Sequence, residues 1–236
     1  MTADRRVLFW DFDGTLAHRP GMWRGCLLEV LDADEPGHSV SEEVIRDALR
    51  DGFPWHRPER PHPHLNDAGA WWSEVEALMA RSYEAAGIEP SRAQELARRA
   101  HELYVDHSRG WELYPDAVEV LCDLRRDGWR HLILSNHVPE LPGMARGLGL
   151  DHLVEAVITS AAIGYEKPHP GAFAAAQRLA GDVDEIWMIG DNPVTDVAGA
   201  EAVGIPGIRV HGEPGGERSA AELRDVPELL RSQPLG

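Results

Sequence analysis

Two aspartates, Asp11 and Asp13, come directly after a run of four apolar residues at positions 7–10. Such a run is typical of a strand that is covered on both faces of a parallel sheet. Open α/β sheets bind their ligands at the carboxyl ends of such strands. Two carboxylates this close repel each other, so the pair requires a cation, a shared proton or both. The same residues followed by Gly14 are also compatible with an ordinary turn.

Polar side chains also follow three later segments that have the pattern of strands. They belong to Ser135, Asn136, Lys167, Asp191 and Asp196. Each of them alone has a plain explanation, such as a helix cap, a solvated charge or a turn. The carboxyl ends of parallel strands meet at one edge of the sheet. Together these residues would therefore place carboxylates, a hydroxyl, an amide and an ammonium group close to one another.

These acids predict a hard divalent cation, with Mg²⁺ as the expected cofactor. Mg²⁺ takes oxygen ligands and is usually held by one or two carboxylates together with a substrate phosphate. Ser135 and Lys167 would place a hydroxyl donor and a positive charge opposite the metal. Phosphoryl transfer depends above all on charge neutralisation and in-line positioning. The residues therefore predict a site that holds a phosphoryl group.

The second half of the chain alternates short apolar runs with helical patterns from about residue 118 onward. This alternation is typical of a βαβ series and predicts an α/β fold with a parallel sheet. With the first strand, the strand patterns number about five; the later four are 131–135, 153–159, 185–190 and 207–210. Helices are expected between them, with Pro near the start or Gly after the end, at 115–127, 139–148, 170–180 and 195–203.

Residues 17–110 differ in character, because they contain no convincing strand pattern and several helical segments separated by Pro-rich loops. Helices are expected from Ser41, over 71–86 and over 91–107. The sequence therefore predicts a catalytic core made of residues 1–16 and 111–236, and an inserted all-helical cap made of residues 17–110.

The composition restricts the partners. The 236 residues carry 23 Lys and Arg against 40 Asp and Glu, a formal net charge of −17. Such a field repels polyanions, so no nucleic acid or anionic membrane is expected as a partner. A small phosphorylated metabolite remains compatible, because a bound metal and local cations can reverse the sign inside one cleft.

The two cysteines, Cys26 and Cys122, are far apart and predict neither a disulfide framework nor a thiolate zinc site. The charged N-terminus runs directly into the first strand without an apolar signal region. No later apolar run approaches the roughly 18 residues that a membrane span needs. A cytoplasmic protein is expected, as a monomer or a homodimer.

In this order and spacing, the motifs resemble those of the haloacid dehalogenase (HAD) superfamily, in the branch with a helical cap after the first strand. The segment 11–16, Asp-Phe-Asp-Gly-Thr-Leu, resembles the first family motif. Ser135-Asn136 resembles the second, Lys167-Pro168 the third, and 190–192 with Asp196 the fourth. The resemblance covers the whole core and implies a Rossmann-like, three-layer sheet.

The resemblance also implies a role for each motif residue. Asp11 would be the nucleophile that forms an aspartyl-phosphate, and Asp13 would carry the proton of the leaving group and then that of water. Phosphate oxygens would be held by Ser135, Asn136 and Lys167. Mg²⁺ would be bound by the Asp11 carboxylate, the Asp13 backbone carbonyl, Asp191 and, directly or as a support, Asp196.

Residue 13 separates the activities of this superfamily. Family members that dehalogenate 2-haloacids lack an acid at this position, because a departing halide needs no proton, whereas a departing alkoxide does. Asp13 therefore favours a Mg²⁺-dependent phosphatase over a dehalogenase. A phosphonate hydrolase would be expected to use a cap lysine, and residues 17–110 contain none.

The motif residues are also compatible with a phosphosugar mutase or a protein without enzymatic activity. A phosphosugar mutase would form the same aspartyl-phosphate and return the phosphoryl group to its substrate. A non-enzymatic phosphate-binding or signalling protein could use an Asp phosphoacceptor, although a receiver domain would carry it in a later strand and lack the insertion.

The cap is rich in aromatic and imidazole side chains, which include Trp23, Trp55, His56, His62, His64, Trp71 and Trp72. They predict either a pocket that stacks on a ring or binds sugar hydroxyls, or simply the packed interior of the cap. His18 and His137 are expected near the cleft, because each lies only a few residues beyond a motif.

Overall fold

A computed structural model describes residues 5–212 and 218–232. Its centre is a five-stranded parallel sheet with the strand order β5-β4-β1-β6-β7. The strands are β1 (Arg6–Trp10), β4 (Trp129–Ser135), β5 (Ala156–Thr159), β6 (Glu185–Gly190) and β7 (Gly207–Arg209). The middle strand, β1, pairs with β4 on one side and with β6 on the other, so the two acids that follow it lie at the centre of the carboxyl edge.

The apolar run of β1 is explained by burial on both faces of the sheet. Leu8 and Trp10 belong to one hydrophobic cluster, whereas Val7 and Phe9 belong to a second cluster on the opposite face. All four side chains are fully buried. Because successive side chains of a strand point to opposite faces, a strand between two helical layers must be apolar at every position.

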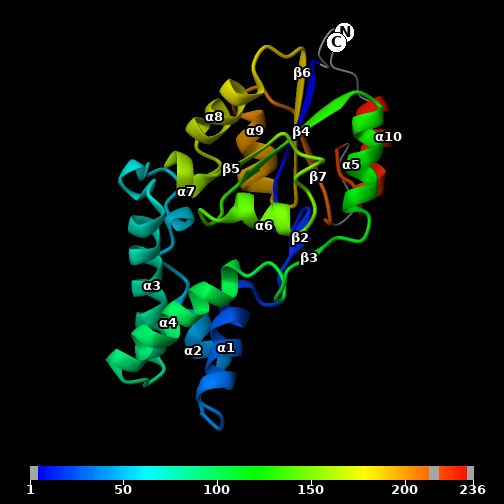
Figure 1. The fold of residues 1–236 in the computed structure, drawn as a ribbon. Coiled ribbons are helices and arrows are strands. Elements are labelled where there is room, and N and C mark those ends of the chain that lie inside the picture. The colour runs from blue at the N-terminus through cyan, green and yellow to red at the C-terminus, as the bar shows by residue number, and fades with distance from the viewer. Residues whose placement is uncertain (1–4, 213–217, 233–236) are drawn as a thin grey trace.

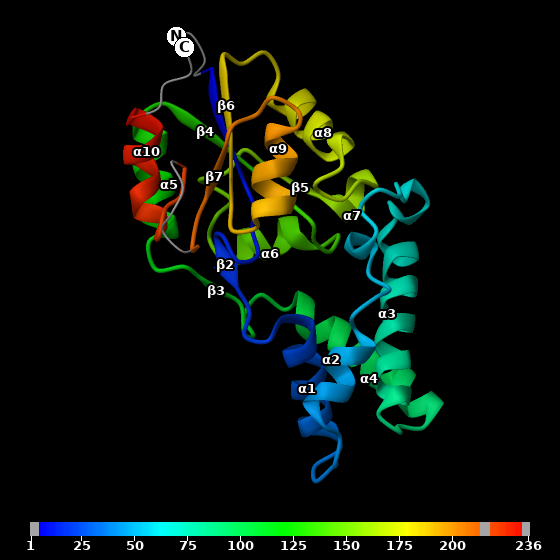
Figure 2. The same cartoon turned by 180° about the vertical axis from the view of Figure 1, so that it is seen from behind.

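Helices cover both faces of the sheet and complete three layers, as Figures 1 and 2 show. One layer contains α5 (Ala117–Arg126) and α10 (Val226–Ser232), and the other contains α8 (Pro170–Ala180) and α9 (Gly199–Glu201). Shorter elements connect the strands: α6 (Leu141–Gly147), α7 (Ser160–Ile163), a π-helical turn η3 (Pro193–Ala198) and η4 (Leu223–Asp225). The predicted α/β fold with a Rossmann-like parallel sheet is confirmed.

Two predicted elements of the core differ most from the observed ones. β5 begins at Ala156 and not at residue 153, because Leu153 and Val154 form a buried turn whose amides donate to the Leu150 carbonyl. The helix expected over 195–203 is instead the π-helical turn η3 followed by α9. A buried turn and a buried strand can both consist of apolar residues, so the sequence pattern alone does not distinguish them.

The helical insertion lies beyond the carboxyl edge of the sheet (Figure 1). It contains α1 (Met22–Asp34), α2 (Glu42–Ala48), α3 (Ala68–Ala85) and α4 (Pro90–Val105), with the short turns η1 (Pro54–His56) and η2 (Pro63–Leu65). The last two helices begin at side-chain caps, because Asp67 accepts from the Ala70 amide and Glu89 from the Ser91 amide. Helix α1 was not predicted, since it follows Gly21 and has no side-chain cap.

A small antiparallel ladder joins the insertion to the core. It is formed by β2 (Ala17–His18) and β3 (Glu112–Leu113), with Ala17 opposite Leu113. The expectation that residues 17–110 contain no strand is therefore wrong for β2, because a two-residue strand is too short to show alternation. The ladder holds the two ends of the insertion side by side. Within the described residues, no helix is long and apolar enough to cross a membrane.

A buried hydrogen-bond chain links the central strand to the α5 layer. The Trp10 indole donates to Nδ1 of His131 over 3.0 Å, and Nε2 of His131 lies 3.0 Å from the Leu121 carbonyl oxygen. This pattern requires a neutral imidazole with its proton on Nε2. Burial accordingly lowers the pKa of His131 to about 4.

We expect His131 to make folding pH-dependent. Between about pH 6.5 and pH 4 the unfolded chain takes up a proton at this residue and the folded chain does not, so stability falls as the pH falls. Comparing urea unfolding of wild type and His131→Gln should show a difference that shrinks toward pH 4, by on the order of 3 kcal/mol. His152→Gln, at an exposed histidine, is the control. A constant His131→Gln difference would contradict the assignment.

Candidate active site

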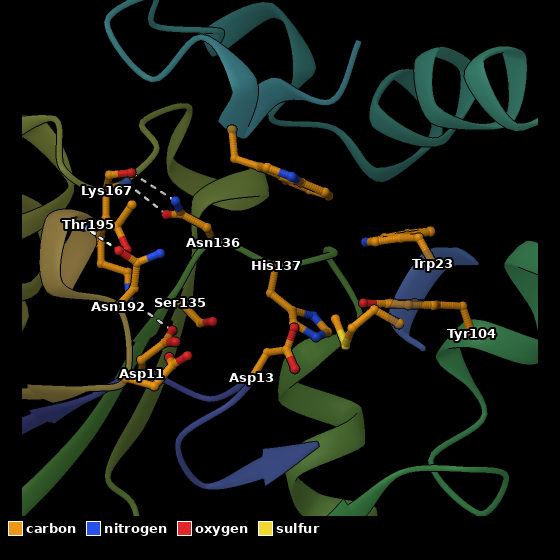
Figure 3. Close-up of a pocket in the computed structure, with 13 residues that line it drawn as sticks. Asp11, Asp13, Trp23, Tyr104, Ser135, Asn136, His137, Lys167, Asn192 and Thr195 are labelled. Atoms are coloured by element: carbon orange, nitrogen blue, oxygen red, sulfur yellow. Dashed lines mark hydrogen bonds and ion pairs between the residues drawn. The ribbon is translucent and has the colours of Figure 1, made fainter. Parts of the chain in front are cut away.

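A cavity of about 400 Å³ opens at the carboxyl edge of the sheet and is lined by residues of both the core and the helical insertion. Figure 3 shows the side chains that surround it. Six predicted site residues line it: Asp11, Asp13, Ser135, Asn136, Lys167 and Asp191. The seventh, Asp196, is fully buried and contacts Lys167 from the core side. The structure therefore brings all seven predicted residues together.

Lys167 lies between two of the acids. Its ammonium group donates to Asp11 Oδ1 over 2.8 Å and to Asp196 Oδ1 over 2.6 Å, and the side chain is almost completely buried. Burial alone would lower the pKa of Lys167, but the two carboxylates outweigh it and raise that pKa. Lys167 is the only lysine of the chain, and it remains charged here.

Asn136 fixes the backbone of Lys167. The Lys167 amide donates to Asn136 Oδ1 over 2.7 Å, and Asn136 Nδ2 donates to the Lys167 carbonyl over 2.9 Å. The oxygen and the nitrogen of the Asn136 side chain are thus both hydrogen-bonded to the Lys167 backbone. These bonds help to position the Lys167 ammonium group. A direct contact of Asn136 with a phosphate stays a prediction. Ser135, the last residue of β4, is buried at the cavity wall.

Two glycines make room for the acids of the fourth motif. Gly14 has a φ of 83°, and a Cβ there would lie 2.7 Å from a carboxylate oxygen of Asp191. The Thr15 hydroxyl accepts from the Asp191 amide over 3.0 Å, which ties the first motif to the fourth. A Cβ at Gly190 would overlap the Asp196 carboxylate. Glycine at both positions is therefore required by close packing.

The site carries four carboxylates and one ammonium group, and this excess of negative charge affects the pKa values of the acids. Burial, and then the negative charges of Asp11 and Asp191, raise the pKa of Asp13 well above its usual range. Burial and Asp11 likewise raise the pKa of Asp191. Burial also raises the pKa of Asp196, against the opposing effect of Lys167. The uncompensated charge favours a further cation or a retained proton.

The same acids fit a divalent cation. Asp11, Asp191 and Asp196 each offer a ligand atom, and these atoms all lie within 4.8 Å of one another. Within the described residues, no other group of His, Cys, Asp and Glu side chains meets this condition. Because Lys167 already engages one oxygen each of Asp11 and Asp196, Asp191 has the carboxylate most available to a metal.

The helical insertion supplies the opposite wall of the cavity. Met22, Trp23, Trp55 and Tyr104 line it, whereas the other two cap tryptophans pack elsewhere. Trp71 is buried in the cap core, and Trp72 donates to Glu140. The structure thus divides the cap tryptophans between the cavity wall and the packed interior of the cap, and the binding of a ring or a sugar at the cavity wall stays a prediction. Sequence reasoning missed Tyr104, because it lies within an amphipathic helix and carries no distinguishing pattern.

The two histidines expected near the cleft differ in position. His137 lines the cavity, and burial lowers its pKa to about 3, so the imidazole is neutral. Its ring meets Phe12 edge-on at 5.4 Å between ring centroids. His18 is not among the lining residues and packs edge-on against Tyr114.

A buried pair connects the Pro-rich cap loop to the loop of the third motif. His62 Nε2 lies 2.9 Å from Glu166 Oε1, and both side chains are buried. The His62 amide also donates to the Gly164 carbonyl over 2.9 Å. Glu166 directly precedes Lys167, so the cap is attached next to the buried ammonium group. This contact, missed from the sequence, joins residues 104 positions apart.

We expect His62→Ala to lower the free energy of unfolding by about 1–3 kcal/mol, because it leaves the buried Glu166 carboxyl without its partner. Urea denaturation measures this change. His64→Ala, two residues away and exposed, should change stability by no more than about 0.5 kcal/mol. Equal stabilities of the two variants would show that the pair does not hold the loop.

The chain is similar in sequence to known proteins. The family model for haloacid dehalogenase-like hydrolases matches residues 6–204. Phosphoserine phosphatase of Thermus thermophilus is 33% identical over 214 residues, with 88% of this chain and 83% of that protein covered. Haloacid dehalogenase-like hydrolase domain-containing protein 3 of Homo sapiens is 31% identical over 217 residues, with 88% and 82% covered.

The fold also resembles that of a solved structure. L-2-haloacid dehalogenase from Xanthobacter autotrophicus superposes with a TM-score of 0.68 at 22% identity, covering 97% of this chain and 99% of that one. The likeness extends over the insertion as well as the sheet, and at this identity it concerns the fold alone.

Proposed function

The chain belongs to the haloacid dehalogenase-like hydrolases, and from this premise we propose that it is a Mg²⁺-dependent phosphatase of a small phosphorylated metabolite. One observation carries the proposal: Asp13, an acid with a raised pKa, lies beside Asp11 in the cavity that also contains Lys167. The 33% identity to a phosphoserine phosphatase supports the reaction class. An acid at position 13 has no use in releasing a halide, which speaks against dehalogenation.

Asp11 is the proposed nucleophile. One carboxylate oxygen accepts from Lys167, which leaves the other oxygen to attack phosphorus. The new Asp11–phosphorus bond forms as the bond from phosphorus to the alcohol oxygen breaks. Lys167 and Ser135 lie at the same cavity wall and would offset or bind the phosphoryl charge.

Asp13 is the proposed proton carrier. Its raised pKa favours a protonated carboxyl group, which would supply this proton to the departing alkoxide. The resulting carboxylate then accepts a proton from the water that attacks the aspartyl-phosphate. Inorganic phosphate leaves, and Asp11 and the protonated Asp13 are restored.

Mg²⁺ would be held by Asp11, the Asp13 backbone carbonyl and Asp191, with Asp196 as a direct or indirect support. The proximity of the three carboxylates fits this assignment. When bound, a divalent cation neutralises phosphoryl oxygens and orients them for in-line attack. Lys167 holds Asp11 and Asp196 in place independently of any metal.

Asp11→Asn should reduce the release of inorganic phosphate from 4-nitrophenyl phosphate to background, because an amide is not a nucleophile toward phosphorus. The activity of the wild type should disappear on chelation and return with Mg²⁺. Asp151→Asn, at an exposed aspartate outside the cavity, serves as the matched control and should retain activity. Turnover by a folded Asp11→Asn protein would place the nucleophile elsewhere.

Asp13→Asn should separate the two half-reactions. Hydrolysis of an alkyl phosphate should fall by about 10²–10⁴-fold, because the alkoxide loses its proton donor. A good leaving group needs little protonation, so 4-nitrophenyl phosphate should give a burst of about one equivalent of nitrophenol and then stall as aspartyl-phosphate. Stopped-flow absorbance and intact-protein mass measure these events. Unchanged steady-state turnover of both substrates would exclude Asp13 as proton carrier.

A further inference from the structure

The cavity has two walls of different chemical character. The core wall carries the acids, Lys167 and the small polar side chains, whereas the cap wall consists of Trp23, Trp55, Tyr104 and Met22. In Figure 3, Trp23 and Tyr104 lie on the far side of Asp13 from Asp11 and Lys167. A phosphoryl group held at Asp11 would therefore direct the alcohol part of its ester past Asp13 toward the aromatic side chains.

The aromatic rings are held in place by one another. Trp23 stacks on Tyr104 with ring centroids 3.7 Å apart and planes at 10°, and Trp55 stacks on Phe53 at 4.4 Å and 12°. The planes of Trp23 and Trp55 differ by 30°. These rings are thus closer to parallel than to perpendicular. Such an arrangement suits a flat ring better than a quaternary ammonium group, which cages of differently oriented rings enclose.

None of the described side chains that line the cavity offers a free positive charge to a second anionic group of a substrate. Among the described residues that line it, Lys167 is the only lysine or arginine, and it already binds two carboxylates. The buried cap arginine, Arg19, is engaged by Glu29 at 2.8 Å and by the Arg109 carbonyl. His137 is neutral.

We propose that this cavity selects phosphate monoesters of uncharged alcohols that carry an aromatic ring, and that it discriminates against esters that carry a carboxylate. The inference rests on the proposed phosphatase function and specifies its substrate class. A carboxylate in the leaving group would lose its hydration beside Asp13 without gaining a counter-charge, whereas a ring would bury apolar area against Trp23 and Trp55. Phosphoserine, the substrate in the name of the Thermus relative, is therefore not the expected substrate.

The first test compares kcat/KM for benzyl phosphate, phosphoglycolate and phosphocholine, with acetyl phosphate as a ring-free reference. Benzyl phosphate should exceed each of the other two esters at least about tenfold. Equal or better use of phosphoglycolate would overturn the proposal, and a preference for phosphocholine would show that the aromatic wall recognises a cation. If acetyl phosphate and all three esters remain intact, the phosphatase function itself fails.

A binding measurement distinguishes a failure of the proposed substrate class from a failure of the phosphatase function. Titration calorimetry on Asp11→Asn with Mg²⁺ measures the affinity for benzyl phosphate and phosphoglycolate without turnover. Tighter binding of benzyl phosphate supports the substrate class even if no ester is hydrolysed by the wild type. Equal affinity for the two ligands would overturn the substrate class even in an active phosphatase.

A matched pair of variants tests whether the aromatic cap wall causes the preference for benzyl phosphate. Trp55→Leu should lower the ratio of kcat/KM for benzyl phosphate to that for acetyl phosphate by about fivefold or more. Trp129→Leu, whose indole lies against Arg6 outside the cavity, should leave this ratio unchanged. Because both substrates are measured on one preparation, a loss of folded protein cancels from the ratio. The same ratio in Trp55→Leu and wild type would exclude this wall as the selecting surface.

Discussion

The buried ion pairs of Lys167 are the interaction on which the rest of the site depends. Its ammonium group touches Asp11 and Asp196, and Asp196 has no exposed surface at all. Carboxylates buried in this way are strongly unfavourable unless a cation pairs with them. The chain contains no other lysine. The side chain of Asn136 forms two hydrogen bonds with the backbone of Lys167 and thereby fixes its position. A single side chain thus permits the core to carry its acids.

The pairing is incomplete, and the remaining excess of negative charge fits the proposed chemistry. The site holds four carboxylates and one ammonium group, so burial and the repulsion between the acids raise the pKa of Asp13 and of Asp191. A raised pKa lets Asp13 hold a proton that it can donate, while the excess negative charge favours a divalent cation. The proposed proton carrier and the proposed metal site therefore have one physical origin, the crowding of acids at the centre of the carboxyl edge.

The helical insertion contributes a different kind of surface. Its stacked rings form an apolar wall facing the charged one, and the His62–Glu166 pair attaches the same insertion beside Lys167. The charged groups thus belong to the core, and the surface that we propose to contact the alcohol part of a substrate belongs to the cap. Because these surfaces come from separate parts of the chain, the wall of the cap can change while the acids stay as they are.

The sequence alone determined the sheet and the seven residues at its edge, because both depend on local patterns. An apolar run such as that of β1 predicts a doubly covered strand, and parallel strands bring their carboxyl ends together. Three contacts were decided only by the tertiary structure. They are the hydrogen bonds of Asn136 with the Lys167 backbone, the buried pair of His62 and Glu166, and the stacking of Tyr104 on Trp23. These contacts join distant positions through the packing of whole helices and loops, and a helical period is the same whether a ring faces a cavity or a core.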